Sequence, residues 1–318
     1  MFEKNNEKLI KKICAYQNII IAKHESPDWD AQGSALALKE IILDNFKNKK
    51  VFVVGDSIDP ETLLIDDEKN LTKEIIESAL MITVDTANFE RIDFKNKNLV
   101  KEIFKIDHHI KIDNYANEEI IDENAIACTQ ILCKIAYTNK WKVSKKAAHN
   151  LFFGLITDSN RFLFDKTSIE TFEAAIFLYK CGVEANQIYN SLYLKDLKLA
   201  SWLNRAFNKI EFVKNYPIAF IKIKKEDYEN TNLSEEEIKS ALSTMSGIKE
   251  IAIWFIAYES FKTKKIKLSI RSRDYNISKV ANLYQGGGHK LASGAKLANE
   301  EEINNFIEDL KKLIDNQL

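Results

Sequence analysis

The sequence predicts an α/β protein made of a doubly wound, mainly parallel sheet domain followed by a smaller mixed-sheet α/β domain. Short continuous apolar runs alternate with helical patterns through the first half of the chain, which is typical of a parallel sheet with crossover helices. From Tyr216 onward the pattern changes to neighbouring β-rich runs. A length of 318 residues suits two ordinary domains. We therefore expect a first domain over residues 1–185, a helical linker over 186–213 and a second domain over 214–318.

The apolar runs of the first domain have the length of strands and carry almost no polar residues, which is typical of strands covered on both faces. We expect strands at 18–23, 51–54, 79–84, 103–106 and 119–121. Apolar residues at helical spacing separate these runs, and Ser144 is a good N-cap for one of the helices. We expect helices at 7–16, 33–45, 126–139, 144–157 and 168–181.

The second domain begins with a predicted strand at 217–223. Ser234 followed by Glu237 is the signature of a capping box, so a helix is expected to start there. The runs 251–258 and 265–270 favour a paired hairpin, and helices are predicted at 277–284 and from about residue 300.

Charge and cysteine usage narrow the class of protein. The chain has 46 Lys and Arg against 47 Asp and Glu, so it shows no broad basic face for a long nucleic-acid tract. Its 4 cysteines are scattered without a C-x-x-C pair, which favours reduced thiols. The N-terminus is polar, and no apolar run reaches the roughly 18 residues of a membrane span. We expect a cytoplasmic protein with a small anionic ligand and no membrane partner.

Acidic and histidine side chains follow three of the predicted strands. The segment 24–30 follows the first strand, Asp85 the third, and the triplet Asp107-His108-His109 the fourth. The carboxyl ends of parallel strands meet at one edge of a sheet, where ligands bind. Asp158 closes a later helix. Small residues at 33–35 begin the helix expected at 33–45, and they would let its backbone amides approach an anion.

These side chains form a set with the chemistry of a metal centre. Four carboxylates and two imidazoles in one crevice would repel and raise each other's pKa, and two divalent cations would remove that cost. Carboxylate oxygen and imidazole nitrogen favour Mn²⁺ over Mg²⁺ or Zn²⁺. Asp85, on the middle strand, is the natural bridge between two cations. The predicted metal ligands are His24, Asp28, Asp30, Asp85, His108 and Asp158.

The second domain offers groups that can bind phosphate. Arg271 and Arg273 alternate on a predicted strand, and guanidinium groups bind phosphate through two hydrogen bonds. Gly286-Gly287-Gly288 would let backbone amides approach a phosphate, and His289 adds a donor. A flexible turn and a solvated strand edge are the alternatives for these two stretches.

The motifs together resemble the DHH phosphoesterase superfamily, which is named for a triplet such as Asp107-His108-His109. His24-x-x-x-Asp28-x-Asp30, Val84-Asp85-Thr86 and Thr157-Asp158-Ser159 resemble its other metal motifs. Arg271-Ser272-Arg273 and the Gly286–Gly294 stretch resemble the DHH-associated domain. Length and domain plan are most similar to the nanoRNase and pAp phosphatase branch. That resemblance implies Mn²⁺-dependent hydrolysis of very short RNA and of 3′-phosphoadenosine 5′-phosphate (pAp).

The resemblance also implies roles for individual residues. His24, Asp28 and Asp85 would hold one metal, and a second set would hold the other: Asp30, Asp85, His108 and Asp158. Catalysis would involve Asp85, His108, His109 and Asp158, with His109 on the scissile phosphate. In the first domain, substrate would contact His109 and Arg161. In the second domain, across an interdomain cleft, it would contact Arg271, Arg273, Gly287, Gly288 and His289. Asn160 stands where relatives often carry glycine. The role of Arg161 therefore stays open between a substrate contact and a structural salt bridge.

Two alternatives stay open. A stand-alone cyclic-di-AMP or pApA phosphodiesterase has the same architecture, and no residue separates it from the nanoRNase reading. A catalytically silent nucleotide-binding module would lack a metal ligand, and all expected ligands are present. The sequence allows a homodimer but does not fix the oligomeric state.

Overall fold

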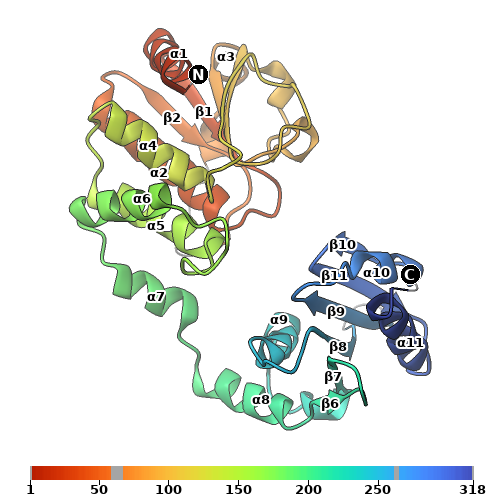
Figure 1. Ribbon diagram of the computed structural model, residues 1–318. Coiled ribbons are helices and arrows are strands. Elements are labelled where there is room, and N and C mark those ends of the chain that lie inside the picture. Colours follow the sequence, from red (N-terminus) through yellow and green to blue (C-terminus); the bar gives the residue numbers. More distant parts are fainter. Residues whose placement is uncertain (1, 59–66, 261–264, 317–318) are drawn as a thin grey trace. The chain divides into compact units, whose positions relative to one another are not determined.

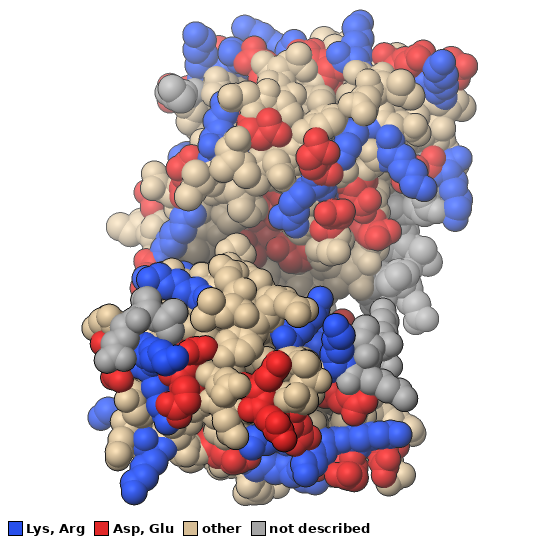
Figure 2. Space-filling model, turned by 90° about the vertical axis from the view of Figure 1, so that its right-hand side faces the viewer, with Lys and Arg blue, Asp and Glu red and all other residues tan. Residues whose placement is uncertain are grey.

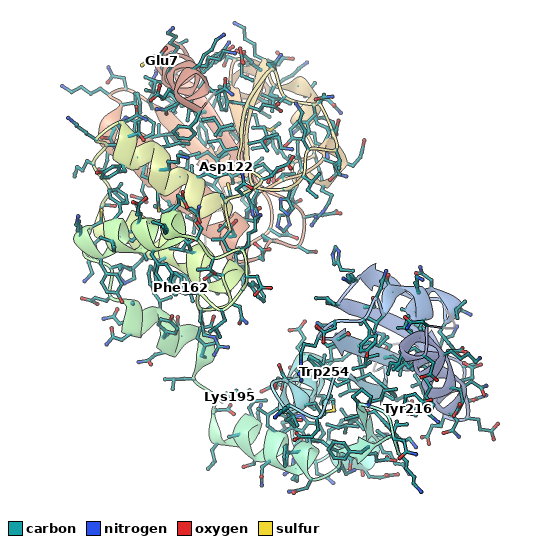
Figure 3. All side chains as sticks on the ribbon, in the orientation of Figure 1. Glu7, Asp122, Phe162, Lys195, Tyr216 and Trp254 are labelled. Atoms are coloured by element: carbon teal, nitrogen blue, oxygen red, sulfur yellow. The ribbon has the colours of Figure 1, made fainter. Side chains whose placement is uncertain are left out.

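The computed structural model describes residues 2–58, 67–260 and 265–316 and divides into two compact units (Figure 1). The boundary falls between Tyr193 and Leu194, inside the segment for which the sequence predicts a linker. Helix α7 (Ala185–Tyr193) belongs to the first unit and α8 (Leu197–Phe207) to the second, and Lys195 lies between them (Figure 3). Among the described helices, none combines the length and apolar character needed to cross a membrane.

The first unit contains a five-stranded sheet in the order β2-β1-β3-β4-β5, and all neighbouring strands run parallel. The strands are β1 (Asn18–Ala22), β2 (Lys50–Val53), β3 (Leu80–Val84), β4 (Glu102–Asp107) and β5 (Glu118–Ile121). The predicted parallel sheet is therefore confirmed. Because β1, β3 and β4 are consecutive neighbours, their carboxyl ends meet at one edge.

Both faces of this sheet are covered, because successive residues of a strand point to opposite sides. Ile19 and Ile21 pack into the larger core, whereas Ile20 and Ala22 pack into a smaller one on the other face. The larger core is closed by α1 (Phe2–Ala15), α2 (Trp29–Asn45), α4 (Cys128–Thr138), α5 (Lys145–Asp158) and α6 (Ile169–Lys180). The smaller one is closed by α3 (Lys73–Glu77) and the short turns η2 (Phe89–Arg91) and η3 (Lys97–Leu99), with η1 (Asp67–Asn70) preceding α3.

Helix α2 corrects two expectations. It begins at Trp29 rather than Gly33, because the Asp28 carboxylate caps it by accepting hydrogen bonds from the amides of Asp30 and Ala31, both at 3.0 Å. The small residues do not approach an anion. A Cβ at Gly33 would lie 2.2 Å from the carbonyl oxygen of Asn150 in α5, so the glycine permits close packing of two helices.

The second unit contains a six-stranded mixed sheet in the order β10-β11-β9-β8-β7-β6, in which only the β7–β8 pair is parallel. The strands are β6 (Glu211–Phe212), β7 (Ile218–Ile223), β8 (Ile253–Glu259), β9 (Ile266–Ser272), β10 (Gly287–His289) and β11 (Ala292–Leu297). The predicted hairpin is the antiparallel pair β8–β9. The mixed-sheet second domain is confirmed.

Helices cover both faces of the second sheet as well. One core packs against α10 (Ser278–Leu283) and α11 (Glu302–Ile314), and the other against α8, α9 (Glu235–Lys239) and the turn η5 (Ser240–Met245), with the turn η4 (Lys225–Asp227) after β7. Ser234 and Glu237 form the predicted capping box. Figure 2 shows positive and negative side chains interspersed on the face in view, as expected from the balanced composition.

Candidate active site

The central strands of the first unit deliver the candidate ligands to one edge of the sheet. His24 follows β1, Asp85 follows β3 directly, and His108 follows β4. Two helix ends reach the same place: Asp30 lies in the first turn of α2, and Asp158 is the last residue of α5. Close packing of α2 on α5 brings these two carboxylates near each other. A Cβ at Gly154 would lie 2.7 Å from Asp30 Oδ1, so a larger residue would push α5 away.

One group of potential ligand atoms comes from His24, Asp28 and Asp85, within 4.8 Å of one another. His24 Nε2 lies 3.8 Å from Asp28 Oδ2 and 3.6 Å from Asp85 Oδ2. His24 and Asp85 are buried, so this group is shielded on its inner side.

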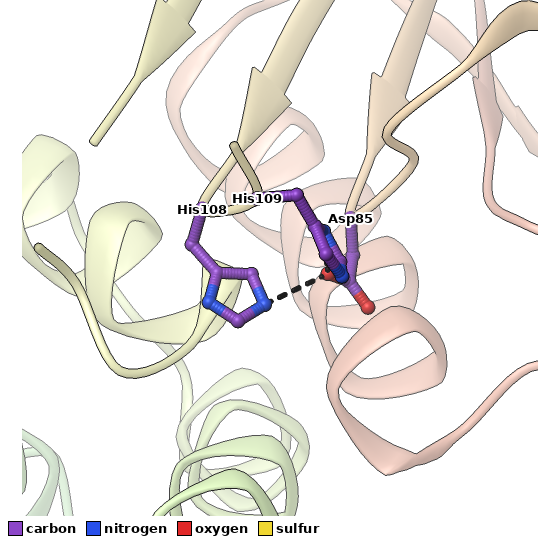
Figure 4. A group of neighbouring side chains, drawn as sticks. All are labelled: Asp85, His108 and His109. Carbon is purple, nitrogen blue, oxygen red and sulfur yellow. Dashed lines mark ion pairs between the residues drawn. The ribbon is translucent and has the colours of Figure 1, made fainter. Parts of the chain in front are cut away.

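A second group comes from Asp30, His108 and Asp158. His108 Nε2 lies 3.8 Å from Asp30 Oδ2, 3.7 Å from Asp158 Oδ2 and 3.2 Å from Asp85 Oδ1. Figure 4 shows the His108 ring turned toward Asp85. Asp85 therefore faces the first group with one carboxylate oxygen and the second group with the other, as a bridging ligand would.

The backbone of Asp85 is held in an unusual conformation. Its φ of +51° is in the left-handed region, which costs a non-glycine residue free energy and is characteristic of functional sites. Its amide donates to the Ile106 carbonyl at 3.0 Å, which fixes the turn after β3. Its buried Oδ1 accepts no hydrogen bond among the described residues. An unsatisfied carboxylate oxygen facing an imidazole fits a cation ligand.

Crowding of carboxylates raises their affinity for protons. Burial raises the pKa of Asp30 to about 7, with a further contribution from the Asp85 charge. Burial also raises the pKa of Asp158 to about 9, and the neighbouring Asp30, Asp28 and Asp85 add to it. For His108, burial lowers the pKa, but the carboxylates outweigh it and raise the pKa to about 9. Divalent cations would replace these protons, so the donor set fits a metal centre.

Asp30 is fixed by a helix far along the chain. Its Oδ2 accepts from the amide of Cys128 at 2.6 Å, and its Oδ1 accepts from the amide and hydroxyl of Thr129 at 2.9 and 2.7 Å. These donors belong to the start of α4, where free amides and the helix dipole favour an anion. Sequence reasoning missed Thr129 and Cys128, because nothing in a helix start identifies a carboxylate that lies 98 and 99 residues away.

His109 is oriented from behind by Asp107. The Asp107 Oδ1 lies 2.8 Å from His109 Nδ1 and accepts from the amides of His108 and His109. Asp107 in turn lies 3.1 Å from the ammonium of Lys105, which is buried and donates to the Ala87 carbonyl. The His109 side chain is 41% exposed, so Nε2 is left to face a ligand. Lys105 was not recognised in the sequence as part of this arrangement.

The loop after α5 explains why asparagine can replace glycine at position 160. Asn160 has φ +46°, a conformation that asparagine tolerates better than most residues, and the amide of Arg161 closes the helix on the Ile156 carbonyl at 2.8 Å. The Arg161 guanidinium lies 5.1 Å from the centre of the Tyr193 ring. In the described part of the chain it stacks there rather than pairing with a carboxylate.

The second-unit candidates lie at one end of the mixed sheet. Ala292 of β11 pairs with Arg271 on one side and with His289 on the other, so these side chains share one face of the sheet. Arg273 differs, because its Nη2 donates to the Ile248 carbonyl at 2.7 Å and also to that of Ile251. It therefore has a structural role, and a substrate contact by Arg273 stays a prediction.

The glycine run is an edge strand, β10, rather than a free turn. Gly287 pairs with Gly294, and Gly288, with φ +136°, lies so close to β11 that a Cβ would meet the Ala292 carbonyl at 2.6 Å. Backbone groups on the outer side of an edge strand are free to bind a ligand.

Comparison with known proteins identifies the family of the chain. The model of the DHH family, N-terminal domain, matches residues 18–155, and that of the DHHA1 domain matches residues 215–316. The chain is 31% identical to the bifunctional oligoribonuclease and PAP phosphatase NrnA of Bacillus subtilis, over 96% of this chain and 97% of the relative. A probable NrnA of Streptococcus mutans is 32% identical over 96% of this chain and 98% of the relative.

A solved structure shows the same fold. The crystal structure of an exopolyphosphatase-related protein from Bacteroides fragilis aligns with a TM-score of 0.83, at 20% identity, over 96% of this chain and 95% of that one. The chain belongs to the DHH family of phosphoesterases, with a DHHA1 domain as its second unit.

Proposed function

We propose that the protein is a Mn²⁺-dependent phosphoesterase that degrades short oligoribonucleotides to mononucleotides and removes a phosphate from pAp. The observation that carries the proposal is the pair of ligand groups that share Asp85, with its two carboxylate oxygens turned to different histidines. Full-length similarity to proteins named as oligoribonucleases and PAP phosphatases supports the choice of substrates.

The residues fit two cations. His24, Asp28 and Asp85 would hold one, and Asp30, Asp85, His108 and Asp158 the other. Their mixture of carboxylate and imidazole ligands favours Mn²⁺. Two such cations supply Lewis-acid charge at a phosphoryl group and make a water molecule a better nucleophile.

The chain's own residues position the substrate around that centre. Asp107 accepts from His109 Nδ1 and turns Nε2 away from it, and with the imidazole doubly protonated Nε2–H would donate to a non-bridging oxygen of the scissile phosphate. Arg161, which is exposed and lies over the Tyr193 ring, would bind a neighbouring phosphate. In the second unit, Arg271 and His289 share a face and bind the distal phosphate or ribose, with Gly287 and Gly288 contributing backbone groups.

A substrate panel tests the proposal. The full-length protein, loaded with Mn²⁺, is incubated with RNA of two to five nucleotides, pAp, pApA and cyclic-di-AMP, and products are separated by chromatography. We expect turnover of the short RNAs and pAp and none without metal. Preference for cyclic-di-AMP or pApA alone would favour the alternative phosphodiesterase. Mn²⁺ binding without turnover of any substrate would support the silent module and overturn the proposal.

A further inference from the structure

Arg91 lies beside the first ligand group without belonging to it. Its Nη2 atom is 3.2 Å from Nδ1 of His24, whereas Nε2 of the same ring faces Asp28 and Asp85. The Arg91 side chain is exposed, and among the described residues it forms no ion pair with a carboxylate. A guanidinium group without an anion, at the edge of a metal centre, is in a position to bind one from a ligand.

The contact between Arg91 and His24 is not a hydrogen bond. Nδ1 of His24 is also 2.9 Å from the carbonyl oxygen of Glu25, and a carbonyl oxygen can only accept, so Nδ1 carries the hydrogen. A guanidinium group can only donate. Two donors therefore face each other, and the part of the chain that the structure describes offers the Arg91 guanidinium no acceptor. Its N–H groups are left for an acceptor on a ligand.

The backbone that carries Arg91 is fixed on two sides. The Arg91 carbonyl accepts from the Glu25 amide at 2.8 Å, which joins the turn η2 to the segment that carries His24. The ammonium group of Lys97 donates to three carbonyls of the turn and its end, at 3.0, 2.9 and 2.9 Å, those of Phe89, Glu90 and Ile92. A turn held in this way presents its side chain with little loss of backbone freedom on binding, as preorganised sites do.

Arg91 and His109 approach the shared aspartate from different sides. His109 Nδ1 lies 3.4 Å from Asp85 Oδ1, and Figure 4 shows the two side chains next to each other. His24, which Arg91 contacts, faces the other oxygen, Oδ2, at 3.6 Å. A phosphoryl group over Asp85 would therefore have a donor on each side. Guanidinium groups bind phosphate oxygens strongly, and their charge offsets the negative charge that grows on these oxygens during hydrolysis.

We propose that Arg91 binds a non-bridging oxygen of the scissile phosphate from the side opposite His109. The proposal rests on the proposed function, because it assigns a further substrate-binding residue to the same reaction. It identifies the group that Arg91 binds as a phosphate oxygen and not a nucleobase. Short oligoribonucleotides and pAp should therefore depend on Arg91 to the same extent.

Phosphate binding by Arg91 variants tests this proposal. The full-length protein, loaded with Mn²⁺, is dialysed to equilibrium against radiolabelled inorganic phosphate, and its Mn²⁺ content is measured by mass spectrometry. Arg91→Ala should weaken phosphate binding about 10–100-fold, the range for losing charge-assisted hydrogen bonds, while the Mn²⁺ content stays that of the wild type. Turnover of a dinucleotide and of pAp should fall by similar factors.

Two further variants separate geometry from charge. Arg91→Lys keeps the charge but not the fork of two donors, so it should lose part of the phosphate affinity. Lys95→Ala removes an exposed positive charge from the segment after η2 and is the matched control, which should bind phosphate as the wild type does.

Several results would overturn the proposal. These are a wild type that binds no phosphate at millimolar concentration, unchanged phosphate binding in Arg91→Ala, and an equal loss in Lys95→Ala, as expected from net charge alone. A loss of Mn²⁺ in step with the loss of phosphate would do the same, because Arg91 would then only orient His24. If Arg91→Ala fails to fold by circular dichroism, Arg91→Lys decides in the same assays. A wild type that binds phosphate through Arg91 but turns over no substrate would overturn the proposed function and support the phosphate contact.

Discussion

The two candidate sites of this protein achieve their backbone geometry in different ways. In the first unit, non-glycine residues adopt left-handed conformations beside the ligand groups, as Asp85 does at φ +51° and Asn160 at φ +46°. In the second unit, the candidate binding residue with a positive φ is a glycine, Gly288 at φ +136°, although Gln285 before the glycine run is also left-handed at φ +50°. A strained functional residue must be held by its surroundings, whereas a glycine needs no such support.

The two candidate sites also differ in how deeply their side chains are buried. Most ligand residues of the first unit are buried or half-buried, although Asp28 is exposed, and Asp30 is held by Thr129. In the second unit, Arg271 and His289 are exposed at one end of a sheet. We conclude that the first site is preorganised for chemistry and that the second contributes binding, which variants can test.

The largest effect is expected at Asp85. Asp85→Asn keeps the volume but removes the charge that serves both ligand groups, so both metals should bind more weakly. We expect turnover on every substrate to fall more than ~10³-fold, beyond the usual cost of losing one catalytic donor. Metal content by mass spectrometry and steady-state rates measure this. Asp165→Asn, on an exposed loop, is the control. Retention of one fully occupied Mn²⁺ site would contradict the shared-ligand geometry.

The two arginines of the second unit should separate binding from stability. Arg271→Ala should raise KM about 10–100-fold with little change in kcat, because the lost contact holds ground state and transition state alike. Arg273→Ala should instead lower the free energy of unfolding by about 1 kcal/mol, since the Ile251 carbonyl loses its donor whereas the Ile248 carbonyl still accepts from the Ile251 amide. Urea unfolding and steady-state kinetics on both variants provide the comparison. A pure loss of kcat in Arg271→Ala would contradict the distal-binding role.

Metal affinity should depend on pH in a defined window. The pKa of Asp30 is raised to about 7 and that of Asp158 to about 9, mainly by burial, so both hold protons at lower pH that a cation must displace. Affinity for Mn²⁺ should therefore rise as pH increases from about 6 to 9, by up to ~10-fold per pH unit for each proton released. Calorimetry in buffers of different ionisation enthalpy counts these protons. An affinity independent of pH would mean that the carboxylates are already ionised.

Sequence reasoning predicted which side chains the structure brings together wherever their position depends on topology. Continuous apolar runs identify the strands, and parallel order brings His24, Asp85 and His108 to one edge without knowledge of any contact. It failed where position depends on packing between distant segments. Thr129 holds Asp30 through an approach of α4 to α2 that no local pattern encodes, and Gly33 looked like an anion site although it serves helix packing.

The smallest effect is expected at Asn160, where the comparison between strained residues and glycine can be made directly. Asn160→Ala places at φ +46° a residue that has a Cβ but no polar side chain. This should lower the free energy of unfolding by about 1 kcal/mol. Asn160→Gly removes the strain, so its stability should equal or exceed that of the wild type. The backbone of the glycine variant is more flexible two residues from Asp158. Mn²⁺ binding should therefore weaken slightly even though the stability of the protein is kept. Urea unfolding and Mn²⁺ titration of both variants measure the two quantities. If Asn160→Gly bound Mn²⁺ as tightly as the wild type, the strained turn would serve only to end α5, and rigidity at the metal edge would have to come from the buried hydrogen bonds alone.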